Sequence, residues 1–130
     1  PSPARWAAAW PKMQALVREM HRRGVRLTTG SDLTNPWVIP GESLHQEFEL
    51  LREAGLPVEA VLRATGADAA RALGRTDVGV VEAGRRADLV LLSADPRADV
   101  RNTRRIVWVM QGGELVSKGP RTAPLPAEGR

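Results

Sequence analysis

The stretch "GVRLTTGSD", residues 24–32, joins a short apolar run to an aspartate that ends it abruptly. Residues 25–29 are rich in β-branched side chains and are bounded by glycines, which is typical of a short β-strand. A loop with two prolines, Pro36 and Pro40, follows the aspartate. The pattern therefore predicts a strand over 25–29, with Asp32 at its carboxyl end and a long loop beyond it.

Two interpretations of Asp32 follow from this position. Enzymes built on α/β barrels carry their catalytic groups at the carboxyl ends of strands. A carboxylate there can bind a divalent metal or act as a general base. Aspartate after Gly-Ser is also common in turns and at helix N-termini, and the local pattern alone favours this structural role.

Helical patterns lie on both sides of this stretch. Before it, apolar residues recur at three- and four-residue steps, which predicts an amphipathic helix over 4–23: Trp6, Trp10, Met13, Leu16, Val17 and Met20. Pro11 is expected to kink this helix or to start a second one, and Gly24 to end it. After the loop, the sequence predicts helices over 43–54, from Pro57 onward, and over 67–74.

The pattern changes near Gly74. An apolar run, Leu89–Leu92, predicts a buried strand, and "RIVWVMQGGELV" predicts two strands joined across Gly112-Gly113. Residues 106–111 alternate in a way that suits a strand buried on both faces. We therefore divide the chain into residues 1–76, residues 77–118 and a tail, 119–130, whose Pro, Gly and Ala content predicts disorder.

The composition excludes several classes of function. The net charge is +4, but the 19 basic residues are scattered among acidic ones, and only Trp and one Phe, with no Tyr, are available for stacking, which argues against nucleic-acid binding. The absence of Cys excludes disulfides and thiolate chemistry. No apolar run is long enough to span a membrane. We expect a cytoplasmic protein, with secretion or a periplasmic location left open because the chain begins at Pro rather than Met.

Four stretches in this order resemble the C-terminal third of the amidohydrolase superfamily, in particular its imidazolonepropionase-like and prolidase-like members. They are "GVRLTTGSD", "SLHQEFELLREAGLPVEAVLRATGADAARALG", "VGVVEAGRRADLVLLSADP" and "NTRRIVWVMQGGELV". The resemblance implies an α/β fold. Residues 1–76 would be the C-terminal fragment of a TIM-type barrel, with its last strand and following helices, and residues 77–118 part of a small β-sandwich.

The resemblance also implies a chemistry. The implied reaction is hydrolysis: a divalent metal, usually zinc, assists cleavage of the C–N bond of a small-molecule amide, cyclic amide or dipeptide. Asp32 matches the family's aspartate that binds the metal and carries a proton from the attacking water to the leaving amine. These roles fit the physics, because a metal lowers the pKa of bound water and a neighbouring carboxylate can accept the released proton.

The chain departs from the family in its metal ligands. The family's His-x-His pair, its carboxylated lysine or acidic residue and its two further histidines have no counterpart, since only His21 and His45 are present. A catalytic zinc typically needs three protein ligands, so the isolated chain is expected to be inactive. The alternative is a non-catalytic remnant or interaction module, completed by a partner chain or by a second copy in a homo-oligomer.

Three further residues are candidates for substrate binding. Asn35 and Trp37 lie in the loop after Asp32, where Trp37 either lines a pocket or seals the loop. His45 precedes Glu49 by one helical turn, so the two could bind a metal or position a substrate. The competing interpretation, a partly exposed helix histidine, is favoured because one turn cannot complete a site.

Overall fold

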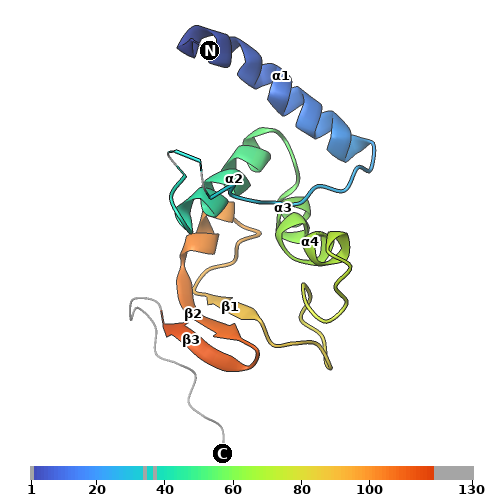
Figure 1. The fold of residues 1–130 in the computed structure, drawn as a ribbon, viewed down its shortest axis with the longest axis vertical. Coiled ribbons are helices and arrows are strands. Elements are labelled where there is room, and N and C mark those ends of the chain that lie inside the picture. Colours follow the sequence, from blue (N-terminus) through green and yellow to red (C-terminus); the bar gives the residue numbers. More distant parts are fainter. Residues whose placement is uncertain (1, 34, 37, 119–130) are drawn as a thin grey trace, which may run out of the picture.

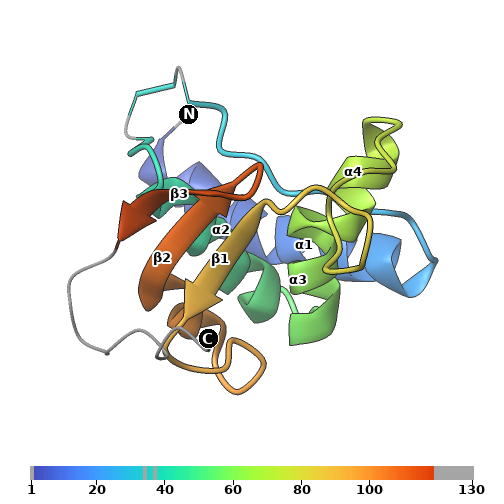
Figure 2. The ribbon, with the colours of Figure 1, turned by 90° about the horizontal axis from the view of Figure 1, so that it is seen from below.

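The computed structural model describes residues 2–33, 35–36 and 38–118. Four α-helices come first: α1 (Pro3–Arg22), α2 (Glu42–Glu53), α3 (Val58–Thr65) and α4 (Ala67–Ala72). They are followed by β1 (Leu89–Leu92), the 3-10 helix η1 (Val100–Arg104), β2 (Ile106–Gln111) and β3 (Glu114–Lys118). The helices gather on one side of the small sheet, and α1 lies farthest from it (Figures 1 and 2).

The predicted helices are confirmed to within one or two residues. A second helix start at Pro11 is wrong, because α1 continues through this residue, whereas a kink there stays a prediction. Gly24, with φ of 76°, ends the helix in a left-handed conformation. Its N–H donates to the His21 carbonyl, and the N–H of Val25 donates to the Met20 carbonyl, both at 3.0 Å. This pair of bonds satisfies the last carbonyls of the helix, as the sequence predicts from the glycine.

The predicted strand over 25–29 is absent from the structure. These residues carry no strand hydrogen bonds to any other described residue. An extended segment becomes a strand only when a neighbour pairs with its backbone, and the described part of the chain offers no such neighbour. The segment is nevertheless held, because Leu27 packs against the core.

The three strands form an antiparallel sheet in the order β1-β2-β3. The turn between β2 and β3 is the predicted Gly112-Gly113 pair, with φ of 60° and 89°. Both values are positive, as a two-residue hairpin turn requires. The prediction that β1 and β2 are buried is wrong in degree: Val90 is 55% exposed, and β2 is only half-buried along most of its length.

The core is small and lies between α2, α3 and η1. It consists of five buried residues: Phe48, Ala54, Leu56, Val61 and Val100. Val17 of α1 and Leu27 of the following segment pack against its edge. Since Val100 belongs to the second predicted region and the others to the first, this core joins the two regions across residue 76. The division at 76/77 itself stays a prediction.

Large apolar side chains remain exposed elsewhere. Along α1, Trp6 is 54% and Leu16 is 61% exposed, so the amphipathic face that the sequence predicts is largely open. Among the described residues, no helix is both long and apolar enough to cross a membrane. Exposed apolar area of this extent marks surfaces that usually contact further protein.

Candidate active site around Asp32

Asp32 stands out in the backbone. Its φ of 49° makes it the one non-glycine residue with positive φ in the described part of the chain. Aspartate tolerates this left-handed conformation better than most residues, but at some cost in free energy. Such conformations persist where the surroundings enforce them, and they cluster at functional sites. The side chain is exposed and therefore free to meet a ligand.

Asn35 holds Asp32 in this conformation. The carboxamide Nδ2 of Asn35 donates to Oδ2 of Asp32, and the backbone N–H of Asn35 donates to the carbonyl of Asp32 at 3.1 Å. The turn fixes both the backbone and one carboxylate oxygen. Oδ1 of Asp32 has no hydrogen-bond partner among the described residues, so this oxygen is available for chemistry.

A second contact fixes the backbone just before Asp32. Oε2 of Glu47, in α2, accepts a hydrogen bond from the N–H of Gly30 at 2.9 Å. Sequence reasoning missed this residue, although a signal was present. Leu44, Phe48 and Leu51 form the apolar stripe of the helix. Glu47 lies three residues after Leu44 and four before Leu51, and therefore on the same face. A glutamate within an apolar stripe indicates a specific partner.

The other predicted site residues lie as follows. Asn35 is beside Asp32, but its carboxamide is engaged with that carboxylate rather than free. Trp37 lies outside the described residues. His45 faces η1, two residues and about 200° around the helix from Glu47. No described hydrogen bond joins His45 to Asp32, and a substrate-binding role for each of these residues stays a prediction.

His45 joins α2 to η1. Its Nδ1 lies 2.9 Å from Oγ1 of Thr103, and that hydroxyl donates its hydrogen to the Val100 carbonyl at 2.8 Å. The hydroxyl therefore accepts from His45, which assigns the hydrogen of the neutral ring to Nδ1. The ring also meets Phe48 edge-on, with 5.9 Å between centroids. Burial, helped by the charge of Arg104, lowers the pKa of His45 from its ordinary value of 6.5, against the opposing effect of Glu42 and Glu49.

This contact predicts a pH dependence of stability. Because the folded pKa lies below the unfolded one, the contribution of His45 is present above about pH 6.5 and is lost as the pH falls through the folded pKa. We expect the melting temperature to fall between about pH 7.5 and about pH 5.5, above the range where most carboxylates titrate. In His45→Gln this fall should shrink. An equal fall in His45→Gln would contradict the assignment.

An ion-pair network reinforces the same contact. The guanidinium of Arg104 lies between Glu42, at 2.6 Å, and Glu49, and Arg101 pairs with Glu49 at 3.0 Å. These pairs lower the pKa of both glutamates, chiefly through Arg104 for Glu42 and Arg101 for Glu49. Glu49 is thus engaged by arginines, and a metal-binding pair with His45 stays a prediction. The network attaches the segment before β2 to the helix that follows the Asp32 loop.

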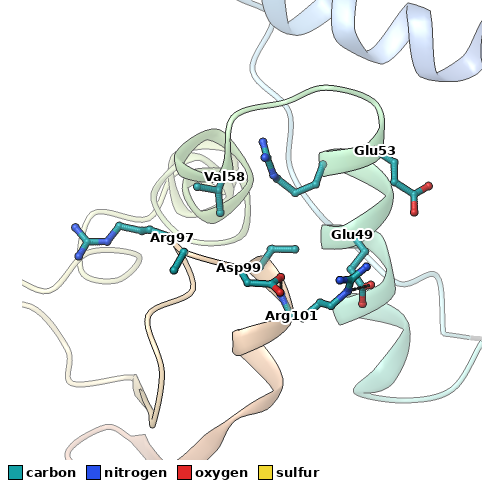
Figure 3. A pocket seen from close by; sticks show the side chains of 9 residues that line it. Glu49, Glu53, Val58, Arg97, Asp99 and Arg101 are labelled. Carbon is teal, nitrogen blue, oxygen red and sulfur yellow. Dashed lines mark hydrogen bonds and ion pairs between the residues drawn. The ribbon is translucent and has the colours of Figure 1, made fainter.

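A shallow hollow of about 320 Å³ lies beside this network, between α2, the start of α3 and residues 97–101. In Figure 3, Arg101 and Asp99 lie in the middle of the group, next to Glu49, whereas Arg97 and Glu53 point away to opposite sides. Its arginines are engaged: Arg101 pairs with Glu49 and Arg97 pairs with Asp95. We assign it no ligand, because its third arginine, Arg52, also has a partner, the Leu56 carbonyl, and no arginine among the described residues of the hollow is left to bind an anion.

The described residues do not form a metal site by themselves. Among residues 2–33, 35–36 and 38–118, no three His, Cys, Asp or Glu side chains lie close enough together to hold an ion. Asp32 fits the role of a single ligand, since it offers an exposed hard oxygen next to a fixed backbone. A set of three or more ligands would therefore need at least one from outside these residues.

Comparisons with known proteins agree on one family. The model of the Amidohydrolase family matches residues 3–116. Imidazolonepropionase from Shouchella clausii (strain KSM-K16) is 36% identical over 110 residues, which are 81% of this chain and 24% of that protein. Adenine deaminase 2 from Rhizobium meliloti (strain 1021) is 43% identical over 65 residues, which are 50% of this chain and 10% of that protein.

The fold is also shared with solved structures. A Xaa-Pro dipeptidase with bound methionine in its active site superimposes with a TM-score of 0.70 and 27% identity. The alignment covers 84% of this chain and 26% of the dipeptidase. The chain therefore spans about a quarter or less of the length of each of these relatives. Since the family model extends over nearly all described residues, the chain belongs to the amidohydrolase family.

Proposed function

We propose that this chain is the C-terminal portion of a metal-dependent hydrolase that cleaves a C–N bond in a small molecule, with Asp32 as the proton carrier. The observation that carries the proposal is the state of Asp32. Within a segment that matches the family, it is an exposed carboxylate in a strained conformation, with one oxygen fixed by Asn35 and the other without a hydrogen-bond partner among the described residues.

The carboxylate of Asp32 is suited to proton transfer. Its open oxygen, Oδ1, would accept a proton from the water that attacks the substrate carbon and deliver it to the departing nitrogen. Positioned acid–base groups of this kind contribute about 10²- to 10⁴-fold in rate. A bound divalent metal, most often zinc in such enzymes, would make the water more acidic and polarise the bond under attack. Asp32 would be one of its ligands.

The exposed apolar faces support the larger architecture. We propose that α1 and residues 24–32 belong to the last part of a TIM-type barrel and that the β1-β2-β3 sheet belongs to a β-sandwich. In such an arrangement, neighbouring strands would pair with residues 25–29, and further protein would cover Trp6, Leu16 and Val90, which are now exposed.

A second candidate rests on the same exposed faces. The chain could be an interaction module that a separate partner chain completes. The two candidates differ in what covers Trp6 and Leu16: further sequence of the same polypeptide or another molecule. Size measurement of the purified active species separates them, because the first predicts turnover by a single polypeptide.

The test uses the complete protein that contains residues 1–130 and three probes chosen from the relatives: imidazolonepropionate, a Xaa-Pro dipeptide and adenine. We expect hydrolysis of a C–N bond in at least one. A chelator should reduce that rate by at least about 10²-fold and added zinc should restore it. Absence of turnover with all three probes, or full activity after verified metal removal, would contradict the proposal.

A further inference from the structure

Glu47 occupies an unusual place for a charged residue. It lies in α2 beside a hollow of about 170 Å³ between α1 and α2, whose other lining residues are almost all apolar: Trp10, Met13, Gln14, Val17, Leu50, Leu51 and Ala54. Burial there raises the pKa of Glu47, and the hydrogen bond from Gly30 opposes this rise. Glu47 takes part in no ion pair with the described residues.

A carboxylate in such surroundings loses favourable hydration. One contact offsets this cost: the N–H of Gly30, 2.9 Å from Oε2 and 17 residues away in the sequence. The segment after α1 doubles back toward α2, which brings Gly30 within reach of the helix (Figure 1). The helix thus holds the chain two residues before Asp32.

Gly30 is a point where the chain needs such a restraint. A glycine loses more conformational freedom on folding than any other residue, so an unrestrained Gly30 would let the following residues move. Nothing lies within 4 Å of the place where its Cβ would be, so packing does not restrain it from that side. Glu47 restrains the chain before Asp32, and Asn35 restrains it after.

We propose that Glu47 is a positioning residue: by accepting the Gly30 N–H, it fixes the backbone that aims the Asp32 carboxylate. The catalytic part of this inference rests on the proposed function. The hydrogen bond between Glu47 and Gly30 is observed in the structure and does not depend on that function. A displacement of about 1 Å in a reacting group can cost about 10²-fold in rate. A loss of rate of up to this size is therefore expected when the hydrogen bond is removed.

The experiment compares Glu47→Ala, Glu47→Gln and Glu53→Ala in the complete protein. Glu53 is the matched control, an exposed glutamate at the end of the same helix that points away from its neighbours (Figure 3). The first measurement is residue-resolved hydrogen exchange at Gly30. Glu47→Ala should exchange at least about tenfold faster than wild type, the equivalent of one hydrogen bond, while Glu47→Gln and Glu53→Ala should stay near the wild-type rate.

The second measurement is kinetic, with the probe that the wild-type protein hydrolyses. In Glu47→Ala, kcat should fall about 10- to 100-fold with little change in KM. Glu47→Gln should recover most of kcat, because its carbonyl oxygen can still accept the hydrogen bond. If Glu47 had only a structural role, Glu47→Ala would lower the melting temperature but would not lower kcat selectively while leaving KM nearly unchanged.

Three results would overturn the proposal. The first is wild-type exchange at Gly30 in Glu47→Ala, and the second is fast exchange with unchanged kcat. The third is a loss in Glu47→Gln as large as in Glu47→Ala, since positioning needs only an acceptor. If the alanine variant fails to fold, the glutamine variant keeps the proposal falsifiable, because a large loss of kcat in it would still overturn the proposal. If the wild-type protein hydrolyses no probe, the proposed function has failed, and exchange at Gly30 alone then decides whether Glu47 holds this backbone.

Discussion

Replacing Asp32 by Asn should abolish turnover in the complete protein while leaving its fold intact. Asparagine matches aspartate in size and tolerates the left-handed conformation observed at φ of 49°. It cannot, however, accept and deliver a proton as a carboxylate does. We expect kcat/KM to fall by at least about 10³-fold, within the range for loss of an acid–base group.

The control for this variant is Asp68→Asn in α4. In the described structure, Asp68 makes an exposed ion pair with Arg71, three residues on, and pairs of this kind contribute little. Turnover should stay within about twofold of wild type, because the surface charge is the property that changes. A measured kcat/KM for Asp32→Asn near that of the control would exclude Asp32 as the proton carrier.

Truncating Phe48 should have the largest effect on stability. Phe48 is 4% exposed, lies at the centre of the core cluster and contacts the edge of His45. Removing its ring leaves a cavity between α2 and η1, so Phe48→Ala should lower the free energy of unfolding by about 3–5 kcal/mol. The loss should also separate the Asp32 loop from its supporting helix.

Denaturant unfolding of the complete protein measures this effect. Phe48→Leu keeps most of the volume and should lose less than half as much stability, and Gln46→Ala, on the exposed side of α2, should lie within about 0.5 kcal/mol of wild type. Equal stability of Phe48→Ala and wild type would mean that this core does not hold α2 in place.

The sequence predicts those parts of the fold whose signals are local. The helices follow from apolar spacing and from the glycines that end them, and the β2-β3 hairpin follows from Gly112-Gly113. The predicted strand over 25–29 is absent from the described structure because a strand depends on a pairing partner, and residue preferences do not show whether one is present. Pro11 does not start a second helix, since α1 continues through it.

In the candidate site, too, features with a local sequence signal could be predicted and long-range contacts could not. Asp32 is proposed as a site residue from its place at the carboxyl end of the predicted strand and from a family resemblance, and its role stays a prediction. The contact of Glu47 with Gly30 spans 17 residues, and that of His45 with Thr103 spans 58, so neither follows from local spacing. The one sequence signal for Glu47 is its position within an apolar stripe, which becomes informative only once a partner is known.

The central claim is that Asp32 belongs to a metal-dependent active site, and the most direct test is a zinc-edge anomalous diffraction map of the complete protein crystallised with zinc. We predict a peak with a carboxylate oxygen of Asp32 at about 2.0–2.2 Å, the usual zinc–oxygen distance, together with ligands from outside residues 1–130. A fully occupied zinc that excludes Asp32 from its ligands, with Asp32 more than about 4 Å away and beyond coordination distance, would contradict the claim.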